Sequence, residues 1–456
     1  MSKKQMSLEV VNPNAAGIDI GSKSHWVAIG QDAEDVKEFG VYSDDNMEMC
    51  QWLHDNKIQN IAMESTGTYW QNLFSCLVSQ GFDVILVNGR QTKNIKGKKT
   101  DIKDCQWIQK LHSLGLLSSS FLPDSTTDVI RTYSRHRQNL LKQSARTVLK
   151  VQKYLRLMNM RLDVVVKDIV GLTGTKIITE FISGETSGKK LAQNRHYNCR
   201  KPEEEIAKAL QYNGRNDYLF ALKQEWETYL HIQKQIESVD KEIKKLLEEI
   251  IDKDDNKKQH VADTKQQKKK NKNTIKGADI NKLSYQYFEG IDLMRIEGVN
   301  DATIMAIISE IGLEGIKKFH SAKQFTAWLR LAPNNKISGG KILNHHIPKG
   351  SSRLKIAFRN AANAIGNLKE GHLADFFRRI NYKKGRVTAI NATARKLAVI
   401  IWNMLAKGVP YNPPTEYLFL DQKRKMKLVS RIKRNIAKFD LNPEDVGFCK
   451  ELKFSN

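Results

Sequence analysis

An alternation of strand-like and helix-like segments over the first 120 residues is the feature that most limits the possible folds. Residues 17–20 and 25–29 have the pattern of strands joined by a turn, and residues 38–42 could pair with them as a third strand. A helix, a strand and a second helix follow, and residues 84–87 then form a continuous apolar run, which is typical of a strand buried on both faces. This order predicts an α/β domain built on a mixed sheet.

Two long helical patterns occupy the middle of the chain. Residues 124–168 mix basic and apolar positions, and residues 217–251 place apolar side chains three or four positions apart. Gln233 and Asp240 interrupt the second pattern, which is therefore coiled-coil-like without a strict heptad seam. Residues 253–282 are rich in lysine and nearly free of apolar side chains, so we expect a solvated or disordered insertion there. Specific contact of its lysines with nucleic acid is the alternative.

The last third of the chain has mainly helical patterns. An apolar helix at 302–311 is stopped by Gly312, and a second helix follows at 321–329. A helix-hairpin-helix element, whose glycine-rich turn offers backbone N–H groups to phosphate, has this pattern, and so do many ordinary helical hairpins. The remaining expected segments are a polar loop at 333–352, helices at 354–368 and 391–404, and a basic helical stretch at 423–438.

These patterns predict four regions along the chain. They are an α/β domain at 1–123, a helical, coiled-coil-like region at 124–290 with its lysine-rich insertion at about 253–285, a mainly α domain at 291–408, and a basic extension at 409–456. A chain of 456 residues is long enough for two or three such domains.

The charge balance indicates a polyanionic partner. Lysine and arginine number 75 against 50 aspartate and glutamate residues, a net charge of +25, and nucleic acid is the commonest partner of such proteins. A membrane surface is less favoured, because no run approaches the roughly 18 apolar residues of a transmembrane helix. The first residues also lack the apolar core of a secretory signal. The cysteines are five in number, scattered and without CxxC spacing, which favours a reducing cytoplasm over a disulfide framework or a zinc site.

Four carboxylates are the first candidates for chemistry. Asp19 lies between apolar residues in a predicted strand, and Glu64 ends another strand. Asp101 and Asp104 are three residues apart, so a helix that starts near Thr100 places both on one face. Hard divalent cations bind oxygen ligands and offset the repulsion between such carboxylates, and a pair of these cations can promote phosphoryl transfer. A helix cap at Asp101 and a turn or helix-start role for Glu64 are the structural alternatives.

Basic residues near these carboxylates are candidates for nucleic-acid binding. The loop at 89–99 leads directly into the expected Asp101 helix, which favours substrate contact over a merely solvated loop. Its basic residues are Arg90, Lys93, Lys96, Lys98 and Lys99. On the first long helix, Arg131, Arg135 and Lys142 are expected to bind phosphates, and a surface for oligomerisation is the competing interpretation.

Ser338 is the second candidate for chemistry. Two glycines follow it, which lets the backbone approach a phosphate closely, and the neighbouring lysines could stabilise a pentacovalent phosphorus. Those lysines are Lys336 and Lys341, which together with Lys349 are also expected to bind nucleic acid. The pattern is also ordinary loop composition, and Ser351 and Ser352 are rival nucleophiles unless they cap the following helix. His345 and His346 could act as acid or base groups, although surface or phosphate contacts suit them better.

Several of these segments together resemble one known family. They are GIDIGS at 17–22, MESTGTYW at 63–70, VILVN at 84–88, KTDIKD at 99–104, IEGV at 296–299, SGGK at 338–341 and KG at 349–350. In this order and separation they resemble the DEDD transposases of insertion sequences, the family called one-ten, with its eleven-eleven subgroup and the Piv-like DNA invertases. The resemblance covers most of residues 15–123 and 291–405.

The resemblance implies a fold and a mechanism. It implies a RuvC-like, RNase H-type fold for the N-terminal domain, with Asp19, Glu64, Asp101 and Asp104 binding Mg²⁺ or Mn²⁺. It further implies that Ser338 is a nucleophile that forms a transient phosphoserine link to a DNA end. Such a recombinase is expected to act on donor and target DNA in the prokaryotic cytoplasm, associated with the nucleoid.

The resemblance also implies partners. It implies a tetramer, a dimer of dimers, in which the RuvC-like domain of one subunit and the serine domain of another form each active site. It implies a structured non-coding bridge RNA as guide, so that base pairing selects the sequence and the protein recognises backbone and shape.

Three positions depart from the family pattern. Ile337 stands where the family loop often has a second serine, which leaves Ser338 as the matching candidate. Cys105 stands where alanine is usual, and the lysine-rich stretch at 253–282 has the character of an insertion. Two alternatives to a guided serine recombinase remain: a RuvC-like nuclease that hydrolyses branched DNA, and a binding protein with a degenerate nuclease fold. The complete carboxylate set disfavours the second alternative.

Overall fold

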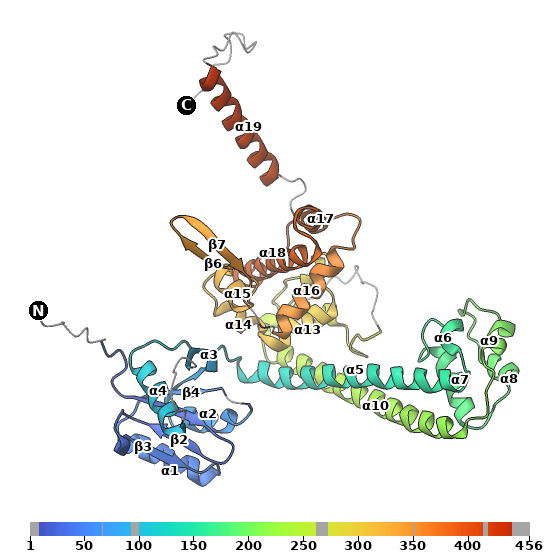
Figure 1. Cartoon of the computed structure of the whole chain (residues 1–456), viewed down its shortest axis with the longest axis horizontal. Helices are drawn as coiled ribbons and strands as arrows, with labels where there is room; N and C mark the ends of the chain where they lie inside the picture. The colour runs from blue at the N-terminus through green and yellow to red at the C-terminus, as the bar shows by residue number, and fades with distance from the viewer. Residues whose placement is uncertain are drawn as a thin grey trace, which may run out of the picture. The chain divides into compact units, whose positions relative to one another are not determined.

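The computed structural model divides the chain into two compact units, Met1–Leu122 and Pro123–Asn456 (Figure 1). The structure describes residues 9–65, 67–92, 100–260, 272–348, 350, 352–413 and 418–439. Each unit has its own core and is described by itself below.

The N-terminal unit contains one mixed five-stranded sheet with the order β3-β2-β1-β4-β5. Its strands are β1 (Ala15–Ile20), β2 (His25–Ala28), β3 (Val36–Phe39), β4 (Asn60–Glu64) and β5 (Asp83–Val87). β1 pairs antiparallel with β2 and parallel with β4, and β4 pairs parallel with β5. The predicted α/β domain on a mixed sheet, with its RuvC-like fold, is therefore confirmed.

Helices cover both faces of this sheet. Ile18 and Met63 point from neighbouring strands into a core with Met49 of α1 (Ser43–Asp55) and Leu73 of α2 (Trp70–Ser79). On the opposite face, α4 (Asp101–Ser113) packs against β1, as the close approach of Gly17 to its backbone shows. The short helices η1 (Ala33–Asp35) and α3 (Gly89–Thr92) complete the described part of the unit.

Residues 84–87 form the expected strand, but only its second half is buried on both faces. β5 lies at the end of the described sheet, where it pairs with β4. Val84 and Ile85 are only half-buried, while Leu86 and Val87 are buried. The continuous apolar run reflects partial cover at a sheet edge rather than a central position.

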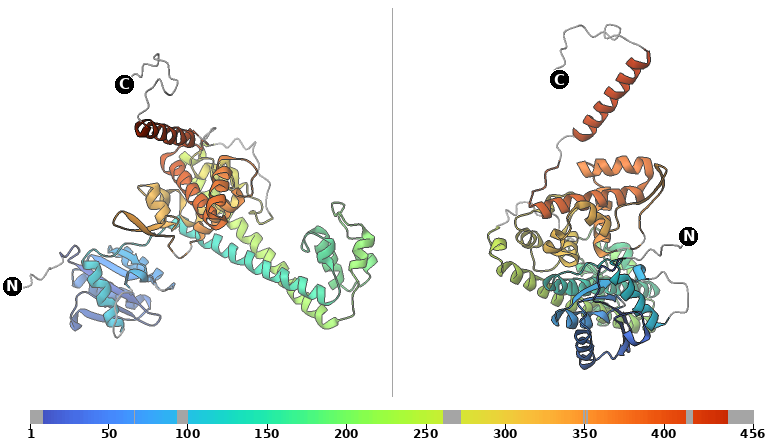
Figure 2. Two further views of the ribbon diagram at one scale, coloured as in Figure 1. Left: turned by 45° about the horizontal axis from the view of Figure 1, so that its top comes forward. Right: turned by 90° about the vertical axis from the view of Figure 1, so that its left-hand side faces the viewer.

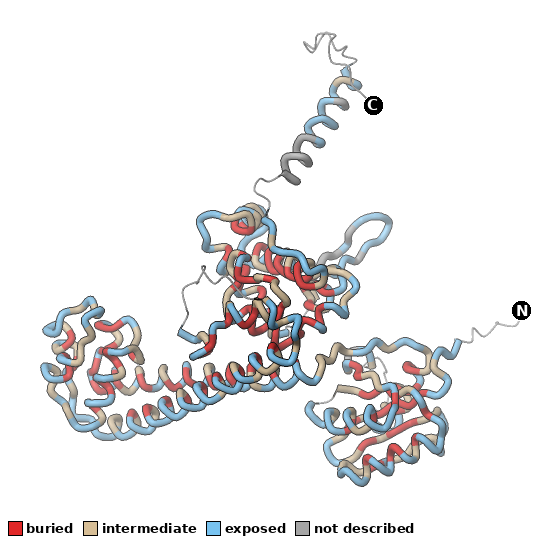
Figure 3. Tube along the Cα trace, turned by 180° about the vertical axis from the view of Figure 1, so that it is seen from behind, coloured by how far each residue is buried: buried red, intermediate tan, exposed pale blue. Residues whose placement is uncertain are grey.

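Two long helices form the backbone of the second unit. α5 (Ser125–Leu157) and α10 (Asn216–Asp252) lie side by side and run in opposite directions (Figures 1 and 2). Their buried residues face each other along the shared seam, and their outer faces are exposed (Figure 3). Leu140 packs there against Ile232 and Ile236. The predicted pair of long helices is present, and the seam contains polar residues at several levels.

Polar pairs cross this seam in place of a continuous heptad core. Arg137 of α5 forms a buried ion pair with Asp240 of α10, with an Nη2–Oδ2 distance of 3.2 Å. The Arg137 Nε–H donates to Asp240 Oδ1, and the backbone N–H of Lys276 donates to Asp240 Oδ2 at 2.8 Å. The Asp240 side chain is only 1% exposed, so Asp240, which the sequence marked as an interruption, is a buried partner of Arg137.

Four short helices close the end of the α5–α10 pair. They are α6 (Leu162–Val165), α7 (Leu172–Ile182), α8 (Gly188–Ala192) and α9 (Glu203–Ala209). Phe181, Leu191 and Ile206 pack with Trp226 of α10 in a separate apolar cluster. The core of this small helical module, residues 158–215, is completed by side chains from the ends of α5 and α10, among them Leu155 and Trp226.

The C-terminal part of the second unit is mainly helical around a two-stranded hairpin. Its elements are α11 (Asp255–Lys258), α12 (Ile280–Tyr287), η2 (Leu293–Arg295), α13 (Asp301–Glu310), α14 (Gly312–Lys317), α15 (Ala322–Trp328), β6 (Asn334–Ser338), β7 (Lys341–His346), α16 (Arg353–Ile365), α17 (His372–Lys384), α18 (Arg386–Lys407) and α19 (Leu418–Phe439). Phe325, Phe358, Phe377 and Leu397 are buried among them. The prediction of a mainly α C-terminal region is confirmed.

Some local expectations differ from the structure. The solvated insertion expected at 253–282 is wrong for its described later part, because Ile275 and Ile280 are buried. The expected polar loop at 333–352 contains the hairpin β6–β7, and α14 lies between the two helices of the expected helix-hairpin-helix element. The lysine-rich composition of the stretch at 253–282 gives little sign of its few apolar residues, which are buried and hold its later part in the fold.

Removal of the Asp240 carboxylate should destabilise the second unit strongly. Asp240→Ala leaves the buried Arg137 guanidinium unpaired, which costs about 3–5 kcal/mol of the free energy of unfolding. Denaturant unfolding followed by circular dichroism measures the loss. Glu225→Ala, which breaks an exposed pair with Lys150 on the same two helices, is the matched control and should change the midpoint little. Equal midpoints for the two variants would contradict this account of Asp240.

Candidate active site

The sheet register places Asp19 and Glu64 side by side. β1 and β4 are parallel neighbours with Ile18 opposite Met63, so the next pair along the strands is Asp19 and Glu64. Because side chains alternate between faces, both carboxylates point away from the core that holds Ile18 and Met63. Both residues are half-buried. They therefore lie on the face of the sheet that α4 covers.

Gly17 allows α4 to approach β1 closely. A Cβ atom at Gly17 would lie 2.2 Å from the backbone nitrogen of Gln109 and 2.5 Å from the carbonyl oxygen of Cys105. No side chain fits in that space, so the strand and helix backbones meet directly. The contact of β1 with α4 therefore lies two residues before Asp19.

The start of α4 carries the other two carboxylates. Thr100 caps the helix, its hydroxyl accepting a hydrogen bond from the backbone N–H of Lys103 at 3.3 Å. Asp101 is exposed in the first turn, and Asp104 is half-buried one turn later. The structural alternative, in which Asp101 itself is the cap, is therefore wrong.

Cys105 reports the proximity of two of these carboxylates. Burial raises the pKa of its thiol to about 12, and the negative charges of Asp19 and Asp104 add to the increase. Both carboxylates therefore lie within electrostatic reach of one side chain, although they come from a strand and a helix 85 positions apart in the sequence.

Thr92 and Gly89 hold Glu64 and were missed by sequence reasoning. Thr92 donates a hydrogen bond from Oγ1 to Glu64 Oε2 at 2.7 Å. A Cβ at Gly89 would lie 2.4 Å from Glu64 Oε1, so the carboxylate rests against a position without a side chain. The indole N–H of Trp107 on α4 donates to the carbonyl of Thr92 at 3.1 Å, which ties this loop to the helix. The signal that the sequence offered for Thr92 and Gly89 is their position just after β5.

Ser338 ends β6 directly before a glycine turn. It lies opposite Lys341 in the hairpin, and Gly339 and Gly340 between them have φ angles of 54° and 73°. Two successive positive φ angles are those of a type I′ turn, which favours glycine at both positions. Ser338 is exposed, and so is Ile337 beside it. The glycines thus form the hairpin and leave the hydroxyl accessible.

The rival serine at position 352 has a structural role. Its hydroxyl accepts a hydrogen bond from the backbone N–H of Lys355 at 3.1 Å, so Ser352 is the N-cap of α16. Ser351 lies outside the described residues, and so do the side chains of His345 and His346.

The structure describes only part of the expected nucleic-acid-binding set. Residues 93–99, with Lys93, Lys96, Lys98 and Lys99, lie outside the described residues, as do Lys349 and the side chains of Arg90 and Lys336. Lys341 and Lys142 are exposed.

Arg131 and Arg135 have partners inside the second unit. Arg135 binds both carboxylate oxygens of Glu310, at 3.0 and 2.7 Å, and Arg131 donates to the Glu310 carbonyl at 2.7 Å. These contacts attach α5 to the end of α13. Phosphate binding by the two arginines stays a prediction.

Two family models match the chain over these sites. A model described as a transposase, of the DEDD type found in IS110 elements, matches residues 16–160, and one described as "Transposase IS116/IS110/IS902 family" matches residues 292–378. The chain belongs to the IS110 family of DEDD transposases. No curated protein matches it.

The family assignment gives these sites an enzymatic context. The first matched segment contains Asp19, Glu64, Asp101 and Asp104, and the second contains Ser338. The chain is accordingly a DNA-transposing enzyme, and its family suggests dependence on a divalent metal ion. Within the described ranges, no helix is long and apolar enough to cross a membrane.

The carboxylate donors suit a hard cation, but they do not form a closed cage. Among the residues that the structure describes, no three His, Cys, Asp or Glu side chains are grouped closely enough to hold a metal ion. Asp19 and Glu64 supply oxygen donors from adjacent strands, and Asp19 and Asp104 both lie within electrostatic reach of Cys105. The set is thus partly assembled on the face between the sheet and α4.

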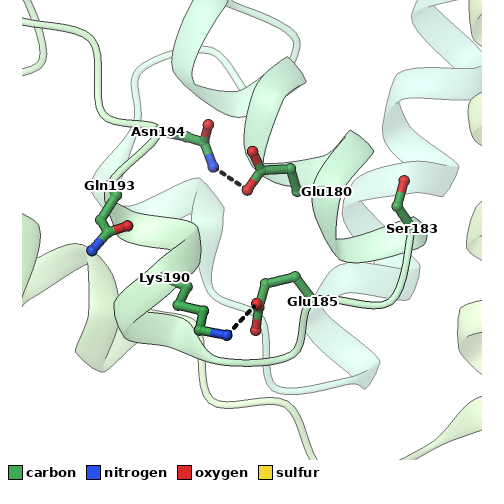
Figure 4. A pocket seen from close by; sticks show the side chains of 6 residues that line it. All are labelled: Glu180, Ser183, Glu185, Lys190, Gln193 and Asn194. Carbon is green, nitrogen blue, oxygen red and sulfur yellow. Dashed lines mark hydrogen bonds and ion pairs between the residues drawn. The ribbon is translucent and has the colours of Figure 1, made fainter.

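A second polar site lies in the small helical module. Its cavity has a volume of about 420 Å³. Polar side chains from α7, α8 and the segments beside them line it (Figure 4). Glu185 pairs there with Lys190 at 3.2 Å, and Asn194 donates to Glu180. These pairings connect α7 to α8, so the polar side chains at this site stabilise the fold of the small helical module.

A side chain at position 17 should disrupt the active face. Gly17→Val forces α4 away from β1, because the new atoms would overlap the backbones of Cys105 and Gln109. We expect a lower thermal midpoint and loss of DNA strand cleavage. Gly81→Asn is the matched control, since no atom lies within 4 Å of that position and asparagine tolerates its φ of 88°. Full cleavage activity in Gly17→Val would refute the proposed role of this contact.

Proposed function

We propose that this transposase cuts and rejoins DNA through a transient 5′-phosphoserine at Ser338. The observation that carries the proposal is an accessible hydroxyl on a glycine-turned hairpin, within a segment that matches a transposase model. Its neighbour Ser352 is engaged as a helix cap, which favours Ser338 among the described serines of this segment.

The covalent step conserves the energy of the phosphodiester. Ser338 Oγ attacks the phosphorus, its proton passes to a base, and the bond from phosphorus to the 3′ oxygen breaks. The 3′ oxygen takes up a proton and leaves as a hydroxyl, while the 5′ phosphate stays bound to Oγ. A 3′-hydroxyl of another strand then reverses these steps and releases Ser338. Bonds are exchanged one for one, so rejoining needs no external energy source.

Asp19, Glu64, Asp101 and Asp104 are the residues that would hold divalent cations in this scheme. Mg²⁺ and Mn²⁺ suit all-oxygen donors, and such cations would supply charge stabilisation to the phosphoryl group. Thr92 orients Glu64, and the Gly17 contact holds α4 with Asp104. A serine hydroxyl has little reactivity by itself, so its activation depends on this carboxylate unit.

The carboxylates and Ser338 belong to different compact units of the chain. We infer that a tetramer, arranged as a dimer of dimers, combines the RuvC-like unit of one subunit with the serine of another. We further infer that a bridge RNA from the element directs the complex to donor and target DNA by base pairing. The resemblance to guided members of the family and the net charge of +25 support these partners.

Replacement of Ser338 tests the covalent step directly. Ser338→Ala should abolish both the protein–DNA adduct and recombination, while nucleic-acid binding stays close to wild type, because only an exposed hydroxyl is lost. The measurement traps the reaction on end-labelled DNA, denatures it and detects label on the protein. Ser238→Ala, which removes an exposed hydroxyl from α10, should behave as wild type. Label on the Ser338→Ala protein would exclude this serine as nucleophile.

Hydrolysis by water is the second candidate function. The DEDD match over residues 16–160 favours it, because carboxylate-bound cations promote hydrolysis without a serine. On this mechanism Ser338→Ala still cuts DNA and releases products with no label on the protein. The same trapping experiment therefore separates the two functions.

Removal of the carboxylates should abolish cleavage on either mechanism. Asp19→Ala, or the double change Asp101→Ala with Asp104→Ala, removes the oxygen donors and should leave folding nearly unchanged. The thermal midpoint without added metal could rise, since repelling charges are gone. Strand cleavage on a DNA substrate with Mg²⁺ or Mn²⁺ is measured against Asp44→Ala, a change at an exposed carboxylate of α1. Wild-type recombination by Asp19→Ala would remove that residue from the site.

A further inference from the structure

Three cationic side chains meet where the hairpin joins α16. Lys355 and Arg359 are four residues apart on one face of α16, and Arg330 follows α15. Lys355 is only 6% exposed, and both arginines are half-buried. This cation cluster, Arg330, Lys355 and Arg359, lies outside the positions that sequence reasoning assigned to nucleic acid.

The charges in this cluster oppose one another. Burial lowers the pKa of Lys355, and the positive charges of Arg359 and Arg330 lower it further. In the part of the chain that the structure describes, Arg359 Nε is buried without a hydrogen-bond partner. Buried charges and donors of this kind are costly unless an anion or acceptor compensates them. The cluster therefore has the electrostatics of a site for an anion.

The backbone at Gly350 lies close against this cluster. Lys355 Nζ donates to the carbonyl oxygen of Gly350 at 3.1 Å. A Cβ at Gly350 would lie 1.9 Å from Arg330 Nη1, and the φ of 104° there also requires glycine. The first turn of α16 begins at Arg353, directly after this loop, and adds the positive end of the helix dipole. Backbone and side chains thus bring positive charge to one place.

We propose that Arg330, Lys355 and Arg359 bind one backbone phosphate of a DNA strand, apart from the phosphate that Ser338 attacks. The cluster anchors the strand and sets its position against the hairpin. Its position relative to a reacting phosphate rests on the proposed function of Ser338.

The competing interpretation is that these cations only hold the loop. Lys355 supports that interpretation through its bond to Gly350, so Arg359 is the more informative residue. Arg359→Gln removes one repelling charge and one unpartnered buried Nε. If the cluster is a phosphate site, the thermal midpoint without DNA should stay or rise, while DNA affinity falls. A purely structural role predicts a lower midpoint and an unchanged affinity.

Binding of the full-length protein to duplex DNA of mixed sequence tests the proposal. For Arg359→Gln, the dissociation constant should rise on the order of tenfold, and the slope of log affinity against log salt should decrease by about 0.9, the value for one lost duplex phosphate. Lys355→Met should give a similar slope. Arg200→Gln, an exposed arginine in the small helical module, is the matched control and should change the slope less. RNA duplexes are measured in parallel, so that a site used by RNA alone is recognised.

Each outcome decides the proposal separately from the role of Ser338. An unchanged slope for Arg359→Gln, an equal change for Arg200→Gln, or a change confined to RNA would overturn it. Ser338→Ala should keep the wild-type slope, because that variant retains the cluster. Suppose that Ser338→Ala still forms the adduct while Arg359→Gln has a smaller salt slope than wild type. In that case Ser338 is not the nucleophile, and the phosphate site stands.

Discussion

The direct contact between the backbones of β1 and α4 at Gly17 is the constraint on which the carboxylate face depends. With any larger residue at this position, Gln109 and Cys105 would have to move away, and α4 would no longer hold Asp104 near Asp19. Gln109 uses the closeness further, since its side-chain amide donates to the carbonyl of Ala15 at 3.2 Å. A helix held by backbone contact and by a buried amide has little freedom to slide along the strand. One missing side chain thus fixes the relation between the strand and helix donors.

Much of the N-terminal unit could be predicted from the sequence, because the spacing of its apolar residues is clear and its strands are short. The position of Asp19 in a strand, the helix from Asp101 and the mixed sheet all followed from local pattern. The contribution of Thr92 and Gly89 did not, because their contact with Glu64 joins positions 25 or more residues apart, and neither residue type signals such a contact. Parallel pairing of β1 with β4 placed Asp19 beside Glu64, and that register is a property of the whole sheet rather than of either segment.

The second unit shows why charge alone is a poor guide to a binding surface. Sequence reasoning assigned Arg131 and Arg135 to phosphates, and both contact Glu310, a carboxylate 175 or more positions away. Arg137, two positions further along α5, is buried against Asp240. Arg131 and Arg135, four residues apart on α5, therefore have partners in the same unit. In contrast, Arg359 Nε on α16 has no hydrogen-bond partner among the described residues. The useful signal is a buried donor without a hydrogen-bond partner, which only the structure reveals.

Under the proposed function, assembly controls the reactivity of the hairpin that carries Ser338. A two-stranded hairpin is only marginally stable by itself, and Ile337 and Leu343 expose 62% and 70% of their surface on it. Covering such exposed apolar side chains with another surface is favourable in free energy, because it removes them from water. On that proposal, a nucleophile on such an element belongs to a different compact unit from the carboxylates and would meet them in the assembled complex. Under the proposed function this separation has a direct benefit, because an unassembled chain that lacks the complete site does not cut DNA. Strand breakage is then confined to complexes in which a second strand is present to be joined.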